Sequence, residues 1–221
     1  MGMHNGNDAS PFIYSLEMYE KEFENILIGI TACYQMMIED NVLLPNNENK
    51  IRDILRKDYL NKKQIRDCIG FTGKYNFDRE VPEDNDRGRV DIKIITQNTL
   101  EEPEAYYIIE CKRLDSQKLL RTKYIEDGIK RFVEEKYSAC HGINGMIGFV
   151  VKQMDICANI ANINNLLENN FAKVNTETVL TSLNFIENFK YQYYSIHKDI
   201  KDKRIKLYHL MFDFSGNMEG Q

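Results

Sequence analysis

The sequence predicts an α/β protein whose core is a mixed sheet flanked by helices. Residues 11–40 carry apolar side chains at three- and four-residue steps, the spacing of a helix with one buried face. Two β-branched apolar runs at 88–95 and 106–112 are bounded by turn-forming residues, which is typical of strands. The charge-free apolar run at 146–151 follows a helical segment and predicts a central strand covered on both faces.

The N-terminal part is expected to be helical. Pro45 and the asparagines after it end the first helix. A second helix then carries Ile51, Leu55 and Tyr59 on its apolar side, and a short third helix is expected near 62–69.

An antiparallel meander of three strands is expected next. Its strands cover 75–81, 88–95 and 106–112, and the turn-forming segments 82–88 and 99–104 join them. The second and third strands should therefore pair side by side.

A crossover helix over 122–139 should lead to the strand at 146–151, with 142–145 as its lead-in. Because such a connection joins parallel strands, we expect the strand at 146–151 to run parallel to that at 106–112.

The C-terminal part is expected to hold a helix at 155–171 and a terminal β-hairpin made of 192–197 and 205–214. His197 and His209 lie on the two hairpin strands, where they can face each other. No acidic residue accompanies them at a metal-site spacing, which favours a core or edge position over a ligand role.

Composition limits the function classes. The chain has 221 residues, is 43% hydrophobic and 29% charged, and fits one large globular domain. No apolar run is long enough to span a bilayer, and the N-terminus lacks a signal-peptide pattern, so we expect a cytoplasmic protein with no membrane partner. The five cysteines form no CxxC pair, which argues against a disulfide framework and a zinc site.

Charged residues interrupt the two apolar strands in the middle of the chain: Asp91 lies in the first, and Glu110 and Lys112 lie in the second. Because side chains alternate between the faces of a strand, Glu110 and Lys112 project together, whereas Cys111 points into the core. If the strands pair, Asp91 stands beside Glu110. Burying a carboxylate without a partner is costly, so two carboxylates and a lysine at one sheet edge favour a divalent-metal hydrolytic site.

This arrangement resembles the PD-(D/E)XK nuclease superfamily, which includes restriction endonucleases. The resemblance rests on Asp91, on residues 108–112 with their Glu-x-Lys, and on the order of strands and helices, and it covers roughly 47–151. Val90 stands where the family places a proline. The resemblance implies a restriction endonuclease-like mixed sheet in a single nuclease-like domain, 1–221. The expected parts of this domain are an N-terminal helical extension at 11–46, a nuclease core at 47–151, and a helix plus terminal hairpin at 152–221.

The resemblance also implies an activity: a metal-dependent phosphodiesterase, most simply a DNA endonuclease in defence or mobile-element biology, with DNA ranked ahead of RNA. Asp91, Glu110 and the backbone carbonyl of Cys111 would hold Mg²⁺, with Mn²⁺ as a substitute, because such hard cations prefer oxygen ligands. Lys112 would position water or stabilise the transition state. A homodimer or a partner protein could supply specificity.

Members of the superfamily often carry a third acid on the helix before the meander. Glu48, Asp53 and Glu22 are the candidates here. Glu48 fits best, because it precedes Ile51 by three residues and Leu55 by seven and so shares the buried face of the helix. Stabilisation of the helix N-terminus is the alternative role for Glu48.

The formal net charge of −5 counts against nucleic-acid binding, but the local distribution of cations favours it. Lys123, Lys130 and Arg131 on the crossover helix are the expected phosphate contacts. The cations that cluster after the third strand are Lys112, Arg113, Lys118, Arg121, Lys123, Lys130, Arg131 and Lys136. A merely solvated surface is the alternative interpretation.

Three alternatives to a nuclease remain open. The first is a catalytically silent nuclease fold that acts as a nucleic-acid-binding or assembly module. The second is a structural protein in which the motif occurs by chance. The third is local: Asp91, Glu110 and Lys112 could form a salt-bridge cluster on a solvated sheet face, where each cross-strand pair contributes only about 0.2–1 kcal/mol.

Overall fold

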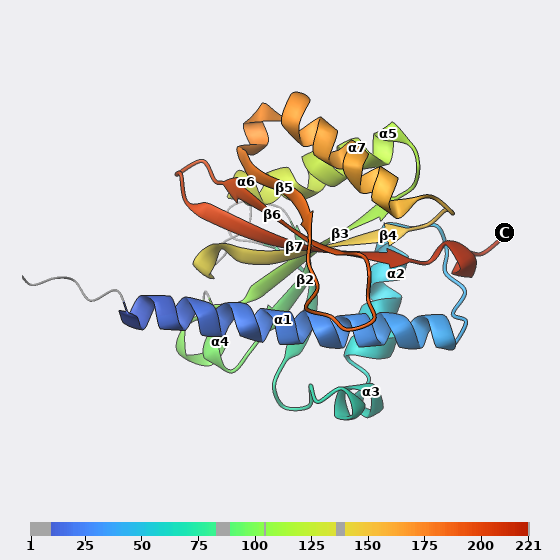
Figure 1. Cartoon of the computed structure of the whole chain (residues 1–221). Coiled ribbons are helices and arrows are strands. Elements are labelled where there is room, and N and C mark those ends of the chain that lie inside the picture. The colour runs from blue at the N-terminus through green and yellow to red at the C-terminus, as the bar shows by residue number, and fades with distance from the viewer. Residues whose placement is uncertain (1–9, 83–88, 104, 136–139, 221) are drawn as a thin grey trace, which may run out of the picture.

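The computed structural model describes residues 10–82, 89–103, 105–135 and 140–220. Their strands form one mixed sheet in the order β1-β2-β3-β4-β7-β6-β5, and helices cover both of its faces (Figure 1). The predicted α/β class is therefore confirmed. Among the residues that the structure places, none of the helices combines the length and apolar character needed to cross a bilayer.

Groups of helices and groups of strands alternate along the chain. The helical elements are α1 (Ser10–Glu39), α2 (Glu48–Ile54), the π-helix η1 (Leu55–Leu60), α3 (Lys63–Cys68), α4 (Asn98–Glu101), α5 (Lys118–Tyr124), the π-helix η2 (Ile125–Ile129), α6 (Lys130–Val133), α7 (Ile156–Asn169), and the 3₁₀ turns η3 (Cys140–Gly142), η4 (Ala172–Val174) and η5 (Ser215–Asn217). The strands are β1 (Asn76–Pro82), β2 (Arg89–Ile95), β3 (Tyr107–Leu114), β4 (Ile143–Val150), β5 (Thr176–Ser182), β6 (Gln192–Lys198) and β7 (Arg204–Asp213).

The sheet separates two apolar cores. On one face, α1 runs across the strands (Figure 1) and buries Phe23, Ile26 and Ile30 completely. On the other face, α5, η2, α6 and α7 cover the second core, which includes Tyr124 and Ile129. The apolar periodicity that predicted the long first helix is thus explained by burial against the sheet.

The predicted meander and crossover are present. β1 pairs with β2 and β2 with β3, both antiparallel, whereas β4 runs parallel to β3. The crossover is made by α5, η2 and α6, which begin earlier than the helix expected at 122–139. Gly128 lies where a Cβ would collide with the Met146 side chain, so the residue allows the crossover to pack closely on β4.

The C-terminal half corrects three expectations. β4 begins at Ile143, so the segment 142–145 is mostly strand and not a lead-in. β5 was not expected; its side chains are largely half-buried or exposed, so the segment lacks the apolar run used to recognise strands. β6 and β7 do form the predicted hairpin, but β7 also pairs parallel with β4, which places it inside the main sheet.

Candidate active site

The site lies where β2 and β3 stop pairing. The last paired residues are Ile92 and Ile109, and Asp91 and Glu110 face each other at the next position. At this position the Asp91 side chain satisfies a backbone donor of β3: its Oδ2 accepts a hydrogen bond from the Cys111 N–H at 2.9 Å. The end of the ladder therefore brings both predicted acids to one point, while the Cys111 side chain packs in the opposite core as expected.

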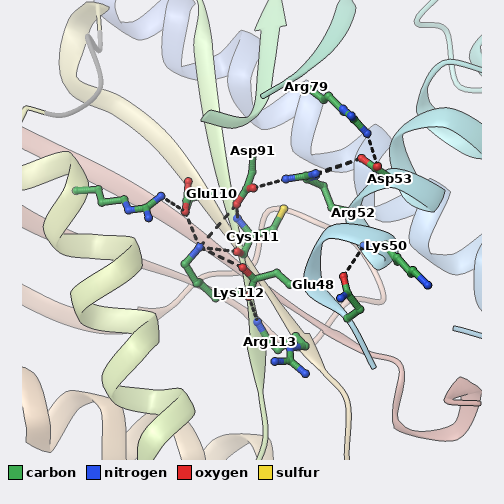
Figure 2. Close-up of polar contacts among 12 residues, drawn as sticks. Glu48, Lys50, Arg52, Asp53, Arg79, Asp91, Glu110, Cys111, Lys112 and Arg113 are labelled. Atoms are coloured by element: carbon green, nitrogen blue, oxygen red, sulfur yellow. Dashed lines mark hydrogen bonds and ion pairs between the residues drawn. The ribbon is translucent and has the colours of Figure 1, made fainter. Parts of the chain in front are cut away.

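The Lys112 ammonium group lies among oxygen atoms from both strands and from α2. Its Nζ is 2.5 Å from Glu110 Oε1, 2.9 Å from the Cys111 carbonyl oxygen, 3.5 Å from Glu48 Oε1 and 3.8 Å from Asp91 Oδ2. Figure 2 shows these four contacts converging on the end of the lysine side chain. One cation thus contacts every residue that was predicted to hold a metal and also Glu48, the preferred candidate for the third acid.

The cluster is buried. The Glu110 side chain is 1% exposed, that of Lys112 8% and that of Asp91 12%. The three residues do form salt bridges, as the alternative interpretation holds, but the cluster lies on a buried part of the sheet and not on a solvated face. In such a site each charge must be compensated by neighbours, because water cannot screen it.

Burial and neighbouring charges shift the pKa values in this cluster. Burial, with a smaller contribution from the Asp91 charge, raises the pKa of Glu110 to about 7, although Lys112 and Arg131 act in the opposite direction. Burial alone would lower the pKa of Lys112, but the charges of Glu110, Asp91 and Glu48 outweigh it and raise that pKa above its ordinary value. Lys112 is therefore firmly cationic.

Glu48 reaches the site from the first turn of α2. Its Oε2 accepts the Arg113 N–H at 2.9 Å, and its Oε1 lies 3.5 Å from Lys112 Nζ. Asn47 caps the helix by accepting the Lys50 N–H, so Glu48 is free to point at β3 instead of its own helix end.

The other two candidates for a third acid lie elsewhere. Asp53 pairs with Arg52 and Arg79, and Glu22 accepts the Tyr107 hydroxyl on the α1 face of the sheet. Of the three acids considered from the sequence, Glu48 is the one whose carboxylate contacts Lys112.

Arg52 is a member of the site that sequence reasoning missed. Its guanidinium is 2% exposed and donates from Nη1 to Asp91 Oδ1 at 2.5 Å, while Asp53 accepts from its other nitrogens. Arg79 in turn pairs with Asp53 at 2.5 Å, and Figure 2 shows the resulting chain from Arg79 to Asp91. The sequence did indicate that Arg52 is buried, since Arg52 precedes Leu55 by three residues and so shares the buried face of the helix.

A cleft opens above the cluster, next to the crossover helix. It has a volume of about 340 Å³. Arg131 lines it and donates to Glu110 Oε1 at 3.0 Å, and Lys123 also lines it. Lys130, the third predicted phosphate contact, instead forms an ion pair with Glu134 at 3.2 Å and is not part of this lining. The lining residues are Asn47, Glu48, Asn49, Lys112, Arg113, Leu120, Lys123, Asp127 and Arg131.

The donor atoms suit a hard divalent cation. Three carboxylates and one backbone carbonyl offer only oxygen, which is the ligand set that Mg²⁺ and Mn²⁺ prefer. Within the described ranges, no group of three or more His, Cys, Asp and Glu side chains is placed so that it could hold a metal ion. The acids are arranged around the Lys112 ammonium instead.

His197 and His209 lie deep in the second core, away from solvent. Ser195 Oγ bridges them, at 2.8 Å from His197 Nε2 and 2.7 Å from His209 Nε2, and the Tyr124 hydroxyl lies 2.9 Å from His209 Nδ1. The two histidines are thus joined through Ser195, and both are 0% exposed. Burial lowers the pKa of His197 to about 4 and holds that of His209 well below its ordinary value.

Comparisons of the sequence and the structure with known proteins found no matching family model, no matching curated protein and no matching solved structure.

Proposed function

We propose that the protein is a metal-dependent nuclease of the PD-(D/E)XK type. The observation that carries the proposal is the convergence of Asp91, Glu110 and Lys112 at the end of the β2–β3 ladder, next to a cleft whose lining includes four cations and two carboxylates. The order of the meander, the crossover and the parallel strand β4 supports the same proposal, because it positions these residues as a restriction endonuclease-like fold would.

Asp91, Glu110, the Cys111 carbonyl and Glu48 are the proposed ligands of Mg²⁺, for which Mn²⁺ could substitute. When bound, the metal would neutralise charge on the scissile phosphate and activate water. Arg52 and the Cys111 N–H fix the orientation of the Asp91 carboxylate from two sides. Such supporting contacts keep a ligand in place and are costly to remove.

The remaining residues act on the phosphodiester. Water adds across a P–O bond, which yields a phosphomonoester and a hydroxyl group, and the charge that develops on phosphorus oxygens needs nearby cations. Lys112 would orient the water or stabilise this charge. Arg131 and Lys123, which line the cleft, would hold adjacent phosphates.

DNA is the proposed substrate ahead of RNA, on the resemblance to this superfamily alone. Phosphate contacts position a nucleic acid without reading its sequence. We therefore propose that specificity, where it exists, comes from a second copy of the chain or from a partner protein.

The proposal is tested by incubating the purified protein with plasmid, single-stranded DNA and RNA in the presence of Mg²⁺ or Mn²⁺. Asp91→Asn and Glu110→Gln remove a charge while keeping the shape of the side chain. We expect each to slow cleavage by roughly a hundredfold or more, because metal binding contributes several kcal/mol to transition-state stabilisation.

Glu177→Gln is the matched control. Glu177 lies on β5, and its carboxylate pairs with Lys198, far from the cleft in the strand order. The control should cleave like the parent. Equal cleavage by the parent and by Asp91→Asn would show that the nuclease assignment is wrong.

One observation favours a second candidate function, that of a catalytically silent nuclease fold that acts as a nucleic-acid-binding or assembly module. The acids of the site are already matched in number by cations of the chain, so the cluster is neutral without a metal. Retention of DNA binding without any Mn²⁺ binding or cleavage would support this candidate. The matched groups are the acids Glu48, Asp91 and Glu110 and the cations Arg52, Lys112 and Arg131.

A further inference from the structure

We propose that Lys112 is a built-in counter-cation: its ammonium group occupies the divalent-metal position in the metal-free protein, and metal binding displaces it into the cleft. This inference rests on the proposed function and concerns how the same site is regulated. Under this inference, Lys112 competes with the metal for the same oxygen atoms before the lysine acts on the substrate.

The contacts of Lys112 carry the inference. Its Nζ contacts the Glu110 carboxylate at 2.5 Å and the Cys111 carbonyl at 2.9 Å, and it approaches Glu48 and Asp91 at 3.5 and 3.8 Å. These are the same oxygens that are proposed to hold Mg²⁺. A metal ion and the ammonium cannot both lie among them, because two cations at such distances repel each other strongly in a buried site.

The surroundings explain why a lysine serves this purpose. Glu110 is 1% exposed, so its carboxylate requires a neighbouring cation whenever it is charged. A lysine carries a compact charge on a flexible four-carbon stem, whereas an arginine holds its carboxylate through a planar fork. Lys112 also lines the cleft, so its ammonium has an open space to enter when a metal replaces it.

The displacement links the metal to the substrate. Once outside the oxygen cluster, the Lys112 ammonium shares the cleft with Lys123 and Arg131 and adds to the positive charge there. Metal binding therefore favours binding of a phosphate group. Because such coupling is reciprocal, a phosphate in the cleft also raises the affinity for the metal.

Binding of Mn²⁺ alone, followed by titration calorimetry without nucleic acid, tests the inference. Lys112→Met removes the ammonium but keeps an unbranched side chain that is one atom shorter, and Lys123→Met removes a charge from the same cleft without opening the oxygen cluster. We expect Lys112→Met to bind Mn²⁺ at least about fivefold more tightly than the parent, a typical coupling, and more tightly than Lys123→Met.

A second measurement on the parent protein covers the case in which Lys112→Met does not fold. Amine acetylation is followed residue by residue with mass spectrometry while Mn²⁺ is added. The inference predicts that Lys112, which is 8% exposed, becomes more reactive as Mn²⁺ binds, whereas Lys206, remote on β7, does not.

The outcomes separate this inference from the proposed function. If Glu110→Gln abolishes Mn²⁺ binding but Lys112→Met binds no more tightly than Lys123→Met, the inference is wrong and the metal site stands. Unchanged acetylation of Lys112 at saturating Mn²⁺ also overturns the inference. If neither the parent nor Lys112→Met binds Mn²⁺, both proposals are wrong.

Discussion

The Asp91 carboxylate is held by two donors of different kinds. Arg52 binds Oδ1 through its guanidinium at 2.5 Å, and the Cys111 backbone binds Oδ2 at 2.9 Å. Both contacts are buried, and Asp53 with Arg79 supports the arginine from behind. The orientation of this single acid therefore depends on residues from α2, β1 and β3.

Replacing Arg52 with methionine should destabilise the protein by about 3 kcal/mol. The variant removes the partner of a nearly buried carboxylate, and loss of one member of a buried pair is far more costly than loss of both. Urea unfolding of Arg52→Met, Asp91→Asn and the double variant measures this.

The double variant should be less destabilised than the sum of the two single variants, because the remaining group is then neutral. Asp53→Asn provides a comparison within the same network, since Asp53 also accepts from Arg52 but is 22% exposed, so its replacement should cost much less. Additive effects of Arg52→Met and Asp91→Asn would contradict a direct interaction.

At this scale, Asp91, Glu110 and Lys112 were identifiable from the sequence because each charge interrupts an apolar strand. Glu48 followed from helical spacing, although only the structure shows its contacts with Lys112 and Arg113. Arg52 was missed because an arginine is usually taken as a surface residue, even beside apolar positions of a helix. Its role depends on how α2 docks against β2, which spacing alone does not determine.

Among the elements, the β6–β7 hairpin carries a polar network that is buried in the second apolar core. Ser195 joins His197 and His209, and the Tyr124 hydroxyl reaches the same network from α5. Neutral imidazoles fit this core, because a buried imidazolium would lose its hydration without an acidic partner.

The hairpin should make the protein sensitive to acid. The pKa of His197 is about 4 in the fold, compared with roughly 6.5 in an unfolded chain, so the unfolded state binds more protons between these values. The contribution of His197 is therefore complete above about pH 6.5 and is lost as the pH falls towards 4.

Comparing the parent with His197→Gln isolates this contribution from that of Glu110, whose raised pKa has the opposite effect on stability over an overlapping pH range. The difference in unfolding free energy should fall by up to about 1.4 kcal/mol per pH unit below pH 6.5. A difference independent of pH from 7 to 5 would show that His197 does not carry this linkage.

Buried strands were easier to predict from the sequence than exposed ones. The apolar runs of β3 and β4 were clear because both strands lie inside the sheet with helices on either face. β5 was missed because it lies at the sheet edge, pairs with β6 through register shifts and carries threonines and serine. The pairing of β7 with β4 is a long-range contact that periodicity does not encode.

For the whole molecule, the most consequential contact is the insertion of β7 between β4 and β6. A strand near the C-terminus thereby joins the meander and crossover to the rest of the sheet. The residues after β7 return to the segment between α1 and α2, where Leu44 pairs with Met218 and exchanges backbone hydrogen bonds with Asn217 and Glu219. These contacts predict a single cooperative unit.

Two truncations test this cooperativity. Ending the chain after Lys203 removes β7, exposes both neighbouring strands and should abolish cooperative unfolding. Ending it after Phe214 keeps all the strands but removes the η5 turn, the contacts to Leu44 and the burial of Met218, and should lower the unfolding free energy by roughly 3 kcal/mol. Circular dichroism with thermal melting distinguishes the two. A folded, cooperatively melting chain that ends at Lys203 would contradict the central role of β7.

The end of the β2–β3 ladder has one more consequence. The Cys111 amide proton is bonded to the Asp91 side chain and not to a backbone carbonyl of β2. Its exchange with solvent deuterium therefore reports on the state of that carboxylate, while the paired Ile109 on the same strand serves as an internal reference. A group that binds the Asp91 carboxylate should therefore change the exchange rate of this one backbone amide, and no substrate is needed for the measurement.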